Sequence, residues 1–264
     1  MNQTISEMTK MLAEERRLQL SEWARVDGRV DANVAASNLD VAVETVRRDL
    51  DVLQRRGVLR RVHGGAISLE RFAHEFTIPE RYGQNPNQKR LVADVAASFI
   101  PDEGCIFVDG GTTTECLAVY LRDKPGLLVV TNNLTLAGKI ADSTTQTYLL
   151  GGKIRPATLS AVGAKTCEDL RELNAAVSFI GANGFSLEAG ATSFDTDEAL
   201  VKKTMMANSR ERILLVDSSK FGSTYPAKFS AFSGFDRIVT NVDVDSSFTD
   251  ALAGSGVQIA LAQQ

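Results

Sequence analysis

Apolar residues in the first part of the chain recur three or four positions apart, which is the spacing of an amphipathic helix. Residues 8–24 carry this pattern until Gly28, residues 33–38 predict a short second helix, and a tight turn through 39–41 leads to a third helix over 43–56. Val46, Leu50 and Leu53 fall on one face of the third helix and predict a buried stripe. The other faces of this helix are polar and free to meet a partner.

A glycine-rich segment follows the third helix. Gly57 suits the left-handed position after a helix end, and residues 58–62 followed by Gly64 and Gly65 predict a short hairpin with a glycine bend. Three helices and a hairpin form the outline of a winged helix-turn-helix domain, which we expect over residues 1–67.

The composition changes after residue 67. Residues 68–88 mix prolines, glycine and asparagines with charges at weak periodicity, which indicates an interdomain linker. In residues 89–264, short apolar runs alternate with helical patterns, and this predicts an α/β domain with a mainly parallel sheet and helices on both faces. The runs are 105–109, 127–131, 147–150, 177–181, 212–217, 237–240 and 257–261.

Charge is distributed unevenly along the chain. The net charge of −4 alone argues against binding to nucleic acid, because duplex DNA attracts cationic surfaces. Residues 1–66, however, carry a net charge of +1 and the remainder −5, and six arginines stand between residues 45 and 66 against Asp49 and Asp51. The positive charge is therefore concentrated on the third helix and the hairpin.

The cysteines show no metal-binding pattern. Cys105, Cys116 and Cys167 have no close pairwise spacing and both histidines precede them, so we expect three small buried thiols, no metal and no cofactor. No run of about 18 apolar residues occurs and the start of the chain is polar, so we expect no membrane contact and a cytoplasmic location.

The start of the third helix carries candidate DNA-reading side chains. In a helix-turn-helix, the first turns of the second helix face base edges, where Arg bonds guanine bidentately and Thr contacts a base or a phosphate. The candidates on the helix are Thr45, Arg47 and Arg48. The candidates that would lie along phosphates on the hairpin are Arg60, Arg61 and, below them in rank, His63.

The alternative to DNA reading is that the third helix is an ordinary solvated helix, in which the arginines pair with Glu44, Asp49 or Asp51.

Two runs, TVRRDL at residues 45–50 and GVLRRVHGGA at residues 57–66, resemble the DeoR family of bacterial transcriptional regulators. The resemblance extends over nearly the whole chain. It implies a repressor of carbohydrate-metabolism genes that binds double-stranded operator DNA as a homo-oligomer, a dimer or a tetramer, under the control of a small phosphorylated sugar.

The chain departs from the family pattern at two places. The family usually has Gly in the turn and Ser as the cap of the recognition helix, where this chain has Asp40 and Ala42. Ala cannot cap free backbone N–H groups, which costs about 1 kcal/mol, and we expect Asp40 to supply a substitute oxygen.

A strand followed by a glycine-threonine turn predicts a phosphate site. Glycines allow backbone N–H groups to converge, a helix start adds partial positive charge, and hydroxyl groups add donors. The candidates are Asp109, Gly110, Gly111, Thr112, Thr113 and Thr114. Because neither a dinucleotide-binding glycine pattern nor a phosphate-loop lysine is present, a purely structural turn is the alternative.

Polar groups also follow other strands, at the edge where open parallel sheets bind ligands. The family's effector domain is itself similar to the ribose-phosphate isomerase and coenzyme A transferase fold. The resemblance implies that Gly152, Arg155 and Lys220 join the loop at the phosphate end. It implies that the polyol or neighbouring structure is faced by Asn132, Asn183, Glu198 and Lys202.

The resemblance also bears on catalysis. Related isomerases place two aspartates beside a glycine-alanine pair, where this chain has Ile180 and Asn183, neither of which can act as a general base. We therefore expect binding without turnover. The alternative is a sugar-phosphate isomerase-like enzyme with an appended DNA-binding head, in which Asp109, Glu198 or Asp217 is the base.

Overall fold

A computed structural model gives the architecture, and it describes residues 12–27, 29–62, 64–68, 75–241 and 255–262. The chain divides into two compact units, Met1–His74 and Glu75–Gln264. The second unit begins within the segment expected to be a linker, because α5 (Ile78–Gly83) and the start of α6 (Pro86–Ala97) belong to it. The weak periodicity of residues 68–88 thus conceals one short helix and the first turn of another.

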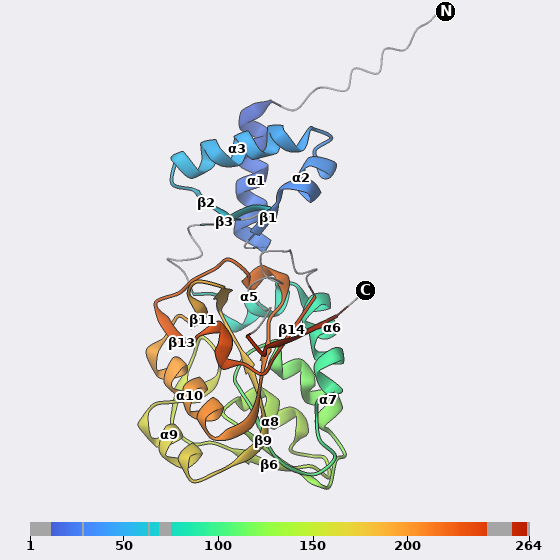
Figure 1. Ribbon diagram of the computed structural model, residues 1–264, viewed down its shortest axis with the longest axis vertical. Coiled ribbons are helices and arrows are strands. Elements are labelled where there is room, and N and C mark those ends of the chain that lie inside the picture. Colours follow the sequence, from blue (N-terminus) through green and yellow to red (C-terminus); the bar gives the residue numbers. More distant parts are fainter. Residues whose placement is uncertain (1–11, 28, 63, 69–74, 242–254, 263–264) are drawn as a thin grey trace, which may run out of the picture. The chain divides into compact units, whose positions relative to one another are not determined.

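In its described residues, the first unit contains three helices and a small antiparallel sheet (Figure 1). The helices are α1 (Ala13–Asp27), α2 (Ala32–Asn38) and α3 (Val43–Arg55). Within the described residues the sheet has the order β1-β3-β2, with β1 (Arg29–Asp31), β2 (Leu59–Val62) and β3 (Gly65–Ser68). The predicted stripe of Val46, Leu50 and Leu53 is buried and packs with Leu20 and Leu59 in the core of this unit.

The second unit is built on a parallel sheet of seven strands in the described part of the chain, with the order β15-β14-β12-β9-β4-β5-β6. Each strand overlaps one of the seven predicted apolar runs, with bounds that differ by up to three residues, and the predicted parallel α/β architecture is confirmed. The strands are β4 (Gly104–Val108), β5 (Leu127–Thr131), β6 (Gln146–Leu149), β9 (Ala175–Gly181), β12 (Ser209–Leu215), β14 (Arg237–Thr240) and β15 (Gln258–Leu261).

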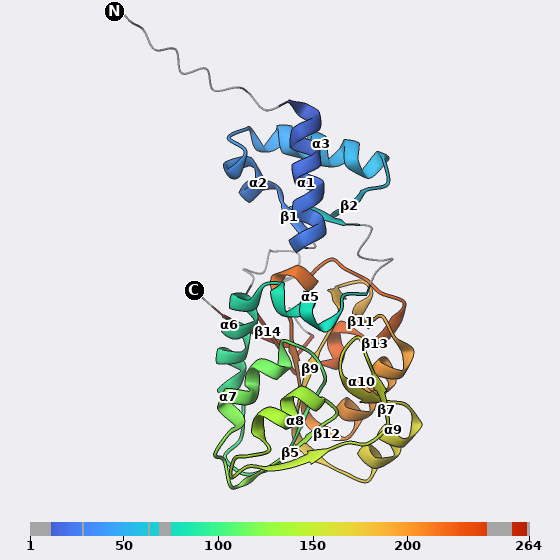
Figure 2. The same ribbon diagram turned by 180° about the vertical axis from the view of Figure 1, so that it is seen from behind.

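Helices cover both faces of this sheet, as the two opposite views show (Figures 1 and 2). Successive side chains of a strand point to opposite faces. Ile106 therefore packs with α6, α7 (Ala118–Leu121) and α8 (Leu134–Ile140), and its neighbour Phe107 packs with α9 (Ala164–Arg171) and α10 (Thr196–Ala207). None of the described helices is long and apolar enough to cross a membrane.

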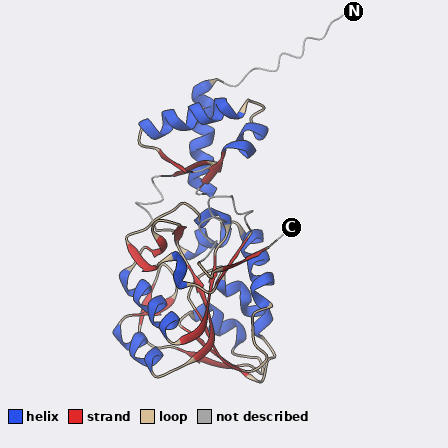
Figure 3. Cartoon of the chain, in the orientation of Figure 1, coloured by secondary structure: helices blue, strands red, loops and turns tan. Residues whose placement is uncertain are grey.

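Short antiparallel strands near the main sheet were not predicted (Figure 3). The strands β7 (Lys153–Arg155) and β8 (Ser160–Val162) form a two-stranded ribbon. A second small sheet joins β10 (Gly184–Ser186), β11 (Gly190–Ser193) and β13 (Ala227–Ser230). Strands of three or four residues are too short to show a clear alternation, which is also why β1 escaped prediction.

The cysteines are less uniform than expected. Cys167 is buried, but Cys105 and Cys116 are only half-buried, which corrects the expectation of three buried thiols. Burial raises the pKa of the Cys105 and Cys116 thiols. Among the residues that the structure describes, no group of three or more His, Cys, Asp or Glu residues could hold a metal ion.

Candidate functional site

The turn between α2 and α3 has unusual chemistry. Asp40 adopts φ 51°, a left-handed conformation that glycine adopts more readily. Ala42 is the N-cap of α3 and provides no side-chain hydrogen bond, and no other side chain caps this end among the described residues. The expectation that Asp40 supplies the missing oxygen is therefore wrong, since its left-handed backbone places it in the turn and not over the helix start.

The candidate DNA-reading residues lie on the outer side of α3. Arg47 and Arg48 are exposed and Thr45 is half-buried. Arg47 Nη1 lies 3.5 Å from Glu44 Oε2, a long contact between two exposed side chains that contributes little to stability. Arg48 has no hydrogen-bond or ion-pair partner within the described ranges. Both guanidinium groups can therefore reach a partner outside the unit.

Asp49, which follows these arginines, points the other way. It is buried, and its carboxylate accepts hydrogen bonds from Arg16 Nε at 2.5 Å and from Arg17 Nε at 2.8 Å. Both arginines belong to α1. The acid therefore fixes α3 on α1 and does not neutralise Arg47 or Arg48.

The hairpin presents its two arginines differently. Arg60 is exposed, while Arg61 is half-buried with Nε 3.1 Å from Asp51 Oδ1. The backbone N–H of Arg61 also donates to Gln54 Oε1 at 2.7 Å, so this residue holds the hairpin against α3. His63 lies outside the described residues. Arg60 is thus the hairpin side chain that is more accessible to phosphates.

The predicted phosphate loop follows β4 at the carboxyl edge of the sheet. Thr112, Thr113 and Thr114 are buried, and Thr114 Oγ1 donates to Asp109 O at 2.7 Å and Gly111 O at 2.9 Å. These bonds close the loop on itself. The helix that follows is short, with a 3₁₀ turn η1 (Thr114–Leu117) before α7.

Asp109 is the most enclosed acid of this loop. Its Oδ2 accepts a hydrogen bond from the Gly181 N–H at 3.1 Å and from Lys202 Nζ of α10. Burial raises the pKa of Asp109, while the Lys202 ammonium and the Gly181 N–H oppose that rise. Two residues predicted from distant parts of the sequence thus form one buried ion pair.

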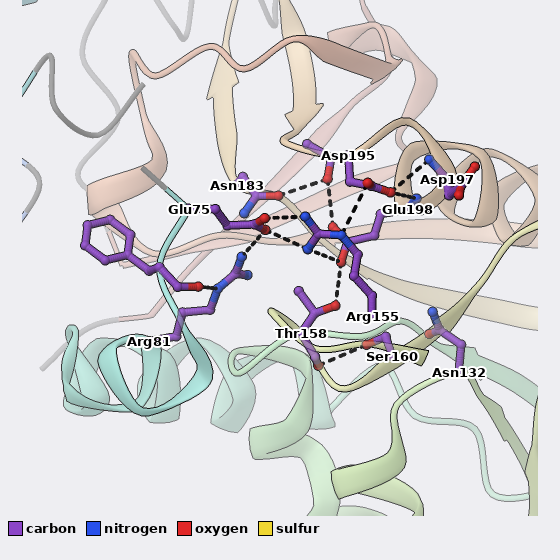
Figure 4. A network of polar contacts seen from close by, with 12 residues as sticks. Glu75, Arg81, Asn132, Arg155, Thr158, Ser160, Asn183, Asp195, Asp197 and Glu198 are labelled. Carbon is purple, nitrogen blue, oxygen red and sulfur yellow. Dashed lines mark hydrogen bonds and ion pairs between the residues drawn. The ribbon is translucent and has the colours of Figure 1, made fainter. Parts of the chain in front are cut away.

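A second group of predicted residues meets around Arg155 (Figure 4). Arg155 Nη1 donates to Glu198 Oε1 at 3.2 Å, and Arg155 Nε lies 3.3 Å from Asp195 Oδ2. Glu198 also accepts from Thr158 Oγ1 at 2.5 Å and from Ser193 Oγ at 3.0 Å. The short strands β7 and β11 carry Arg155 and Ser193, so the unpredicted ribbons build this part of the site.

Glu75 binds the same arginine. Its carboxylate accepts from Arg155 Nη1 at 2.7 Å and from Arg155 Nη2, and Arg81 Nη2 donates to it at 2.7 Å (Figure 4). Hydrogen bonds to the Glu75 carboxylate and attraction to Glu198 raise the pKa of Arg155 against the opposing effect of its burial. Arg155 is therefore surrounded by carboxylates in this structure.

Asn132 and Asn183 lie on either side of these groups. Asn132 Nδ2 donates to Ala161 O at 3.0 Å, and its buried Oδ1 has no partner within the described part of the chain. A Cβ on Gly110 would lie 2.0 Å from Ser160 Oγ, so only glycine fits there. Asn183 Oδ1 accepts from Ser193 Oγ at 3.0 Å, which connects it to Glu198.

Gly152 and Lys220, the other two residues expected at the phosphate end, follow β6 and β12. Gly152 lies against Thr166 of α9, whose Oγ1 would meet its Cβ at 2.2 Å. Lys220 ends the 3₁₀ turn η2 (Ser218–Lys220) after β12 and lowers the pKa of buried Asp217 by its charge. Of the predicted site residues, the structure thus joins Asp109 with Lys202 in one ion pair and Arg155, Asn183 and Glu198 in one polar network.

Helix α5 is bonded to the residue that directly follows the candidate phosphate loop. Tyr82 Oη donates to both carboxylate oxygens of Glu115 at 2.9 Å, and Lys139 Nζ lies 2.5 Å from Glu115 Oε1. Burial and the hydrogen bond to Glu115 raise the pKa of Tyr82 to about 12. Glu115 directly follows Thr114, so α5 is fastened beside the candidate phosphate loop.

Sequence reasoning did not find several members of the site. They are Glu75, Arg81, Thr158, Ser193 and Asp195. Glu75 and Arg81 fall in the segment interpreted as a linker, and Thr158 and Ser193 stand in or next to short ribbons without a visible pattern. Asp195 had a usable signal, because an Asp followed three residues later by a Glu is typical of a helix start, and in the structure Asp195 caps α10 by accepting from the N–H groups of Asp197 and Glu198.

Two family models match the chain. Residues 16–72 match the DeoR-like helix-turn-helix domain and residues 84–242 match the DeoR C terminal sensor domain. The chain is 35% identical over 210 residues to the HTH-type transcriptional regulator FruR of Bacillus subtilis, covering 79% of this chain and 82% of FruR. It is 34% identical over 231 residues to the lactose phosphotransferase system repressor of Lactococcus lactis, covering 86% of this chain and 90% of that protein.

Solved structures show a weaker likeness. Ribose 5 phosphate isomerase A from Neisseria gonorrhoeae is 18% identical, with a TM-score of 0.38. The match covers 57% of this chain and 56% of that one, so the chain spans just over half of that structure.

Proposed function

Because the chain belongs to the DeoR family of transcriptional regulators, we propose that α3 reads operator DNA and that the second unit senses a small phosphorylated sugar. The relative from Lactococcus lactis is named a repressor of a sugar phosphotransferase system, which supports repression of carbohydrate-metabolism genes. A homo-oligomer, a dimer or a tetramer, fits this function because two copies of a helix-turn-helix bind the two halves of a symmetric operator.

The DNA-binding proposal rests on one observation about α3. Arg47 and Arg48 are exposed in its first two turns, while the neighbouring acid Asp49 is buried and paired with α1. The outer side of the helix start is therefore cationic. We assign Arg47, Arg48 and Thr45 to base edges and nearby phosphates, and Arg60, Arg61 and His63 to phosphates along the hairpin, with Arg61 the less accessible of the described pair.

The test is a binding titration on DNA from the region upstream of the gene, at several salt concentrations. Arg47→Ala plus Arg48→Ala should weaken specific binding by about 30-fold or more, because one good bidentate contact contributes about 1–3 kcal/mol. The matched control is Arg25→Ala plus Arg210→Ala, which removes the same charge from exposed positions outside α3. Equal affinity of the two double variants would refute the assignment.

The sensor proposal rests on the carboxyl edge of the parallel sheet, where such sheets bind ligands. There the loop of Asp109, Gly110, Gly111, Thr112, Thr113 and Thr114 carries hydroxyl groups and backbone N–H groups suited to a phosphate. We propose that Gly152, Arg155 and Lys220 complete the phosphate end. We propose that the polyol is contacted by Asn132, Asn183, Glu198 and Lys202.

A thermal-shift panel tests the sensor. Sugar phosphates should raise the melting temperature of the protein while the corresponding unphosphorylated sugars do not, because a ligand that binds only the folded state stabilises it. Thr113→Glu should abolish the response by placing a carboxylate in the loop, whereas Thr144→Glu, at an exposed position, should keep it. A complete lack of response to phosphorylated sugars would refute the proposal.

We also propose that the second unit does not turn its ligand over. Ile180 is buried and apolar, and Asn183 carries an amide, so neither residue provides a general base where the related isomerases have aspartates. A coupled isomerase assay with the sugar phosphates that bind should give no rate above background. Turnover that disappears in Glu198→Gln would favour the enzyme instead.

A further inference from the structure

Arg155 is bound by three acids, and these acids are held differently. Glu198 accepts hydrogen bonds from the hydroxyl groups of Thr158 and Ser193, and Asp195 accepts two from the backbone at the start of α10. Glu75 is bound only by Arg81 and Arg155 within the part of the chain that the structure describes. Glu75 is therefore the acid whose described partners are the two guanidinium groups themselves, which a ligand anion could bind in its place.

The charges around Arg155 decide what can bind there. Glu75, Asp195 and Glu198 stand against Arg81 and Arg155, so the cluster already holds one excess negative charge. A further anion would set four acidic groups against two guanidinium groups in a partly buried site, where unpaired charge is costly. An anion that replaces Glu75 leaves the charge count of the cluster close to its present value.

The two arginines bind the Glu75 carboxylate in the way they would bind the anionic group of a ligand. Two guanidinium nitrogens of Arg155 bind its two carboxylate oxygens, and Arg81 binds one of the same oxygens. Such a fork is the arrangement in which arginine binds carboxylate and phosphate groups alike. Glu75 thus occupies a ready-made anion subsite formed by Arg81 and Arg155.

The position of Glu75 in the chain gives this contact a consequence. Glu75 is the first residue of the second unit, and the DNA-binding unit ends at the residue before it. Arg81 also donates from Nε to Phe76 O at 2.9 Å, and the next residue, Tyr82, is bonded to Glu115 beside the candidate phosphate loop. The entry of the chain into the sensor is therefore fastened through the same side chains that would contact an effector.

We propose that Glu75 is an internal competitor for the anionic group of the effector. When the phosphate of a sugar phosphate binds Arg155 and Arg81, it displaces Glu75, frees the chain entry at residues 75–77 and thereby changes DNA affinity. This inference rests on the proposed sensing of a phosphorylated ligand and adds the regulation of that site.

Binding of inorganic phosphate to Glu75→Gln provides the first test. Removal of the competitor should tighten binding at least tenfold relative to the wild type, measured by thermal shift and by calorimetry. Glu103→Gln, at an exposed position outside the cluster, removes the same charge and should bind like the wild type. Glu75→Asp keeps the charge on a shorter side chain and should give an intermediate affinity, which guards against a folding defect in the first variant.

Equal or weaker phosphate binding by Glu75→Gln, with its unfolding transition intact, would overturn the inference, because a residue that merely orients Arg155 would lower affinity when changed. In that case the wild type would still respond to phosphorylated ligands and the proposed function would stand. If no variant and no wild-type sample responded to inorganic phosphate or to any sugar phosphate, both proposals would fall together.

Hydrogen exchange and DNA binding provide the second test. Phosphate should speed amide exchange over residues 75–84 in the wild type, and Glu75→Gln should exchange at the faster rate without phosphate. The variant should also shift affinity for the upstream DNA in the same direction as saturating phosphate shifts that of the wild type. Unchanged exchange, or a DNA shift in the opposite direction, would overturn the coupling.

Discussion

Asp49 follows Arg48 in the sequence, yet its carboxylate accepts a hydrogen bond from Arg16 Nε of another helix at 2.5 Å. The buried acid therefore holds α3 against α1, while the two arginines that precede it are exposed. Because Arg16 is itself almost fully buried, this pair is an internal structural contact of the DNA-binding unit.

Asp49→Asn should destabilise the DNA-binding unit by about 2–3 kcal/mol, because it removes the charge of the buried carboxylate that accepts from the Arg16 guanidinium. The measurement is the free energy of unfolding in urea. Asp51→Asn, two residues along the same helix, removes a half-exposed partner of Arg61 and should cost less than about 1 kcal/mol. Equal losses of unfolding free energy in the two variants would show that the buried Asp49 pair stabilises the unit no more than the exposed Asp51 pair does.

Ala42→Ser should stabilise the same unit by about 1 kcal/mol, because α3 lacks a side-chain cap and a serine hydroxyl can accept from a free N–H group. Thermal unfolding of the two proteins measures the gain. The control is Ala97→Ser at the last residue of α6. A hydroxyl group at this end of a helix cannot cap the free N–H groups of the first turn, so the variant should not be more stable than the wild type. A loss of stability in Ala42→Ser would mean that the open helix end is satisfied in another way.

Glu14 should titrate at an unusually low pH. Hydrogen bonds from Arg56 and Arg17 lower its pKa from 4.5 to about 2, so its ionised form is favoured by folding. The stabilisation it provides is present above the ordinary pKa and is lost as the pH falls from about 4.5 towards 2. Side-chain carbon NMR of the wild type and of Arg56→Gln checks this, since the variant should return the midpoint towards 4.5. A midpoint that does not depend on Arg56 would show that this arginine is not the cause of the low pKa.

Gly110→Ala should destabilise the sensor unit by about 1–3 kcal/mol, because the added methyl group would lie 2.0 Å from Ser160 Oγ. Chemical denaturation provides the measurement. The double variant Gly110→Ala plus Ser160→Gly removes the obstructing side chain and should recover part of the loss, whereas Gly138→Ala has open space around it and should not destabilise through a clash. Failure of Ser160→Gly to recover any stability would place the strain elsewhere.

The main sheet could be predicted because a buried parallel strand has a continuous apolar run, and the runs around Ile106, Val129 and Phe179 are of this kind. The stripe on α3 was predictable for the same reason, since Val46 and Leu50 recur with the helical period. In these elements the order of apolar and polar residues is enough to show which side chains are buried.

The surroundings of Arg155 could not be predicted in this way. Its partners Glu75 and Glu198 are far apart in the sequence, and they meet only because α10 and the start of the second unit converge on the ribbon of β7 and β8. An ion pair of this kind leaves no periodic signal. The sequence therefore showed that Arg155 belongs to a polar edge, but not that acids already occupy it.

The strand order of the sheet has a consequence for biosynthesis. The central strands β4 and β9 pair directly, although β5, β6 and several helices lie between them in the chain. During translation the apolar sides of β4 and its neighbours must therefore wait for β9 to leave the ribosome, since contacts between distant segments form slowly. The DNA-binding unit has its described core contacts within the first part of the chain and can complete its folding earlier. We accordingly expect nascent chains of this regulator to depend on chaperones mainly while the sensor sheet is half built.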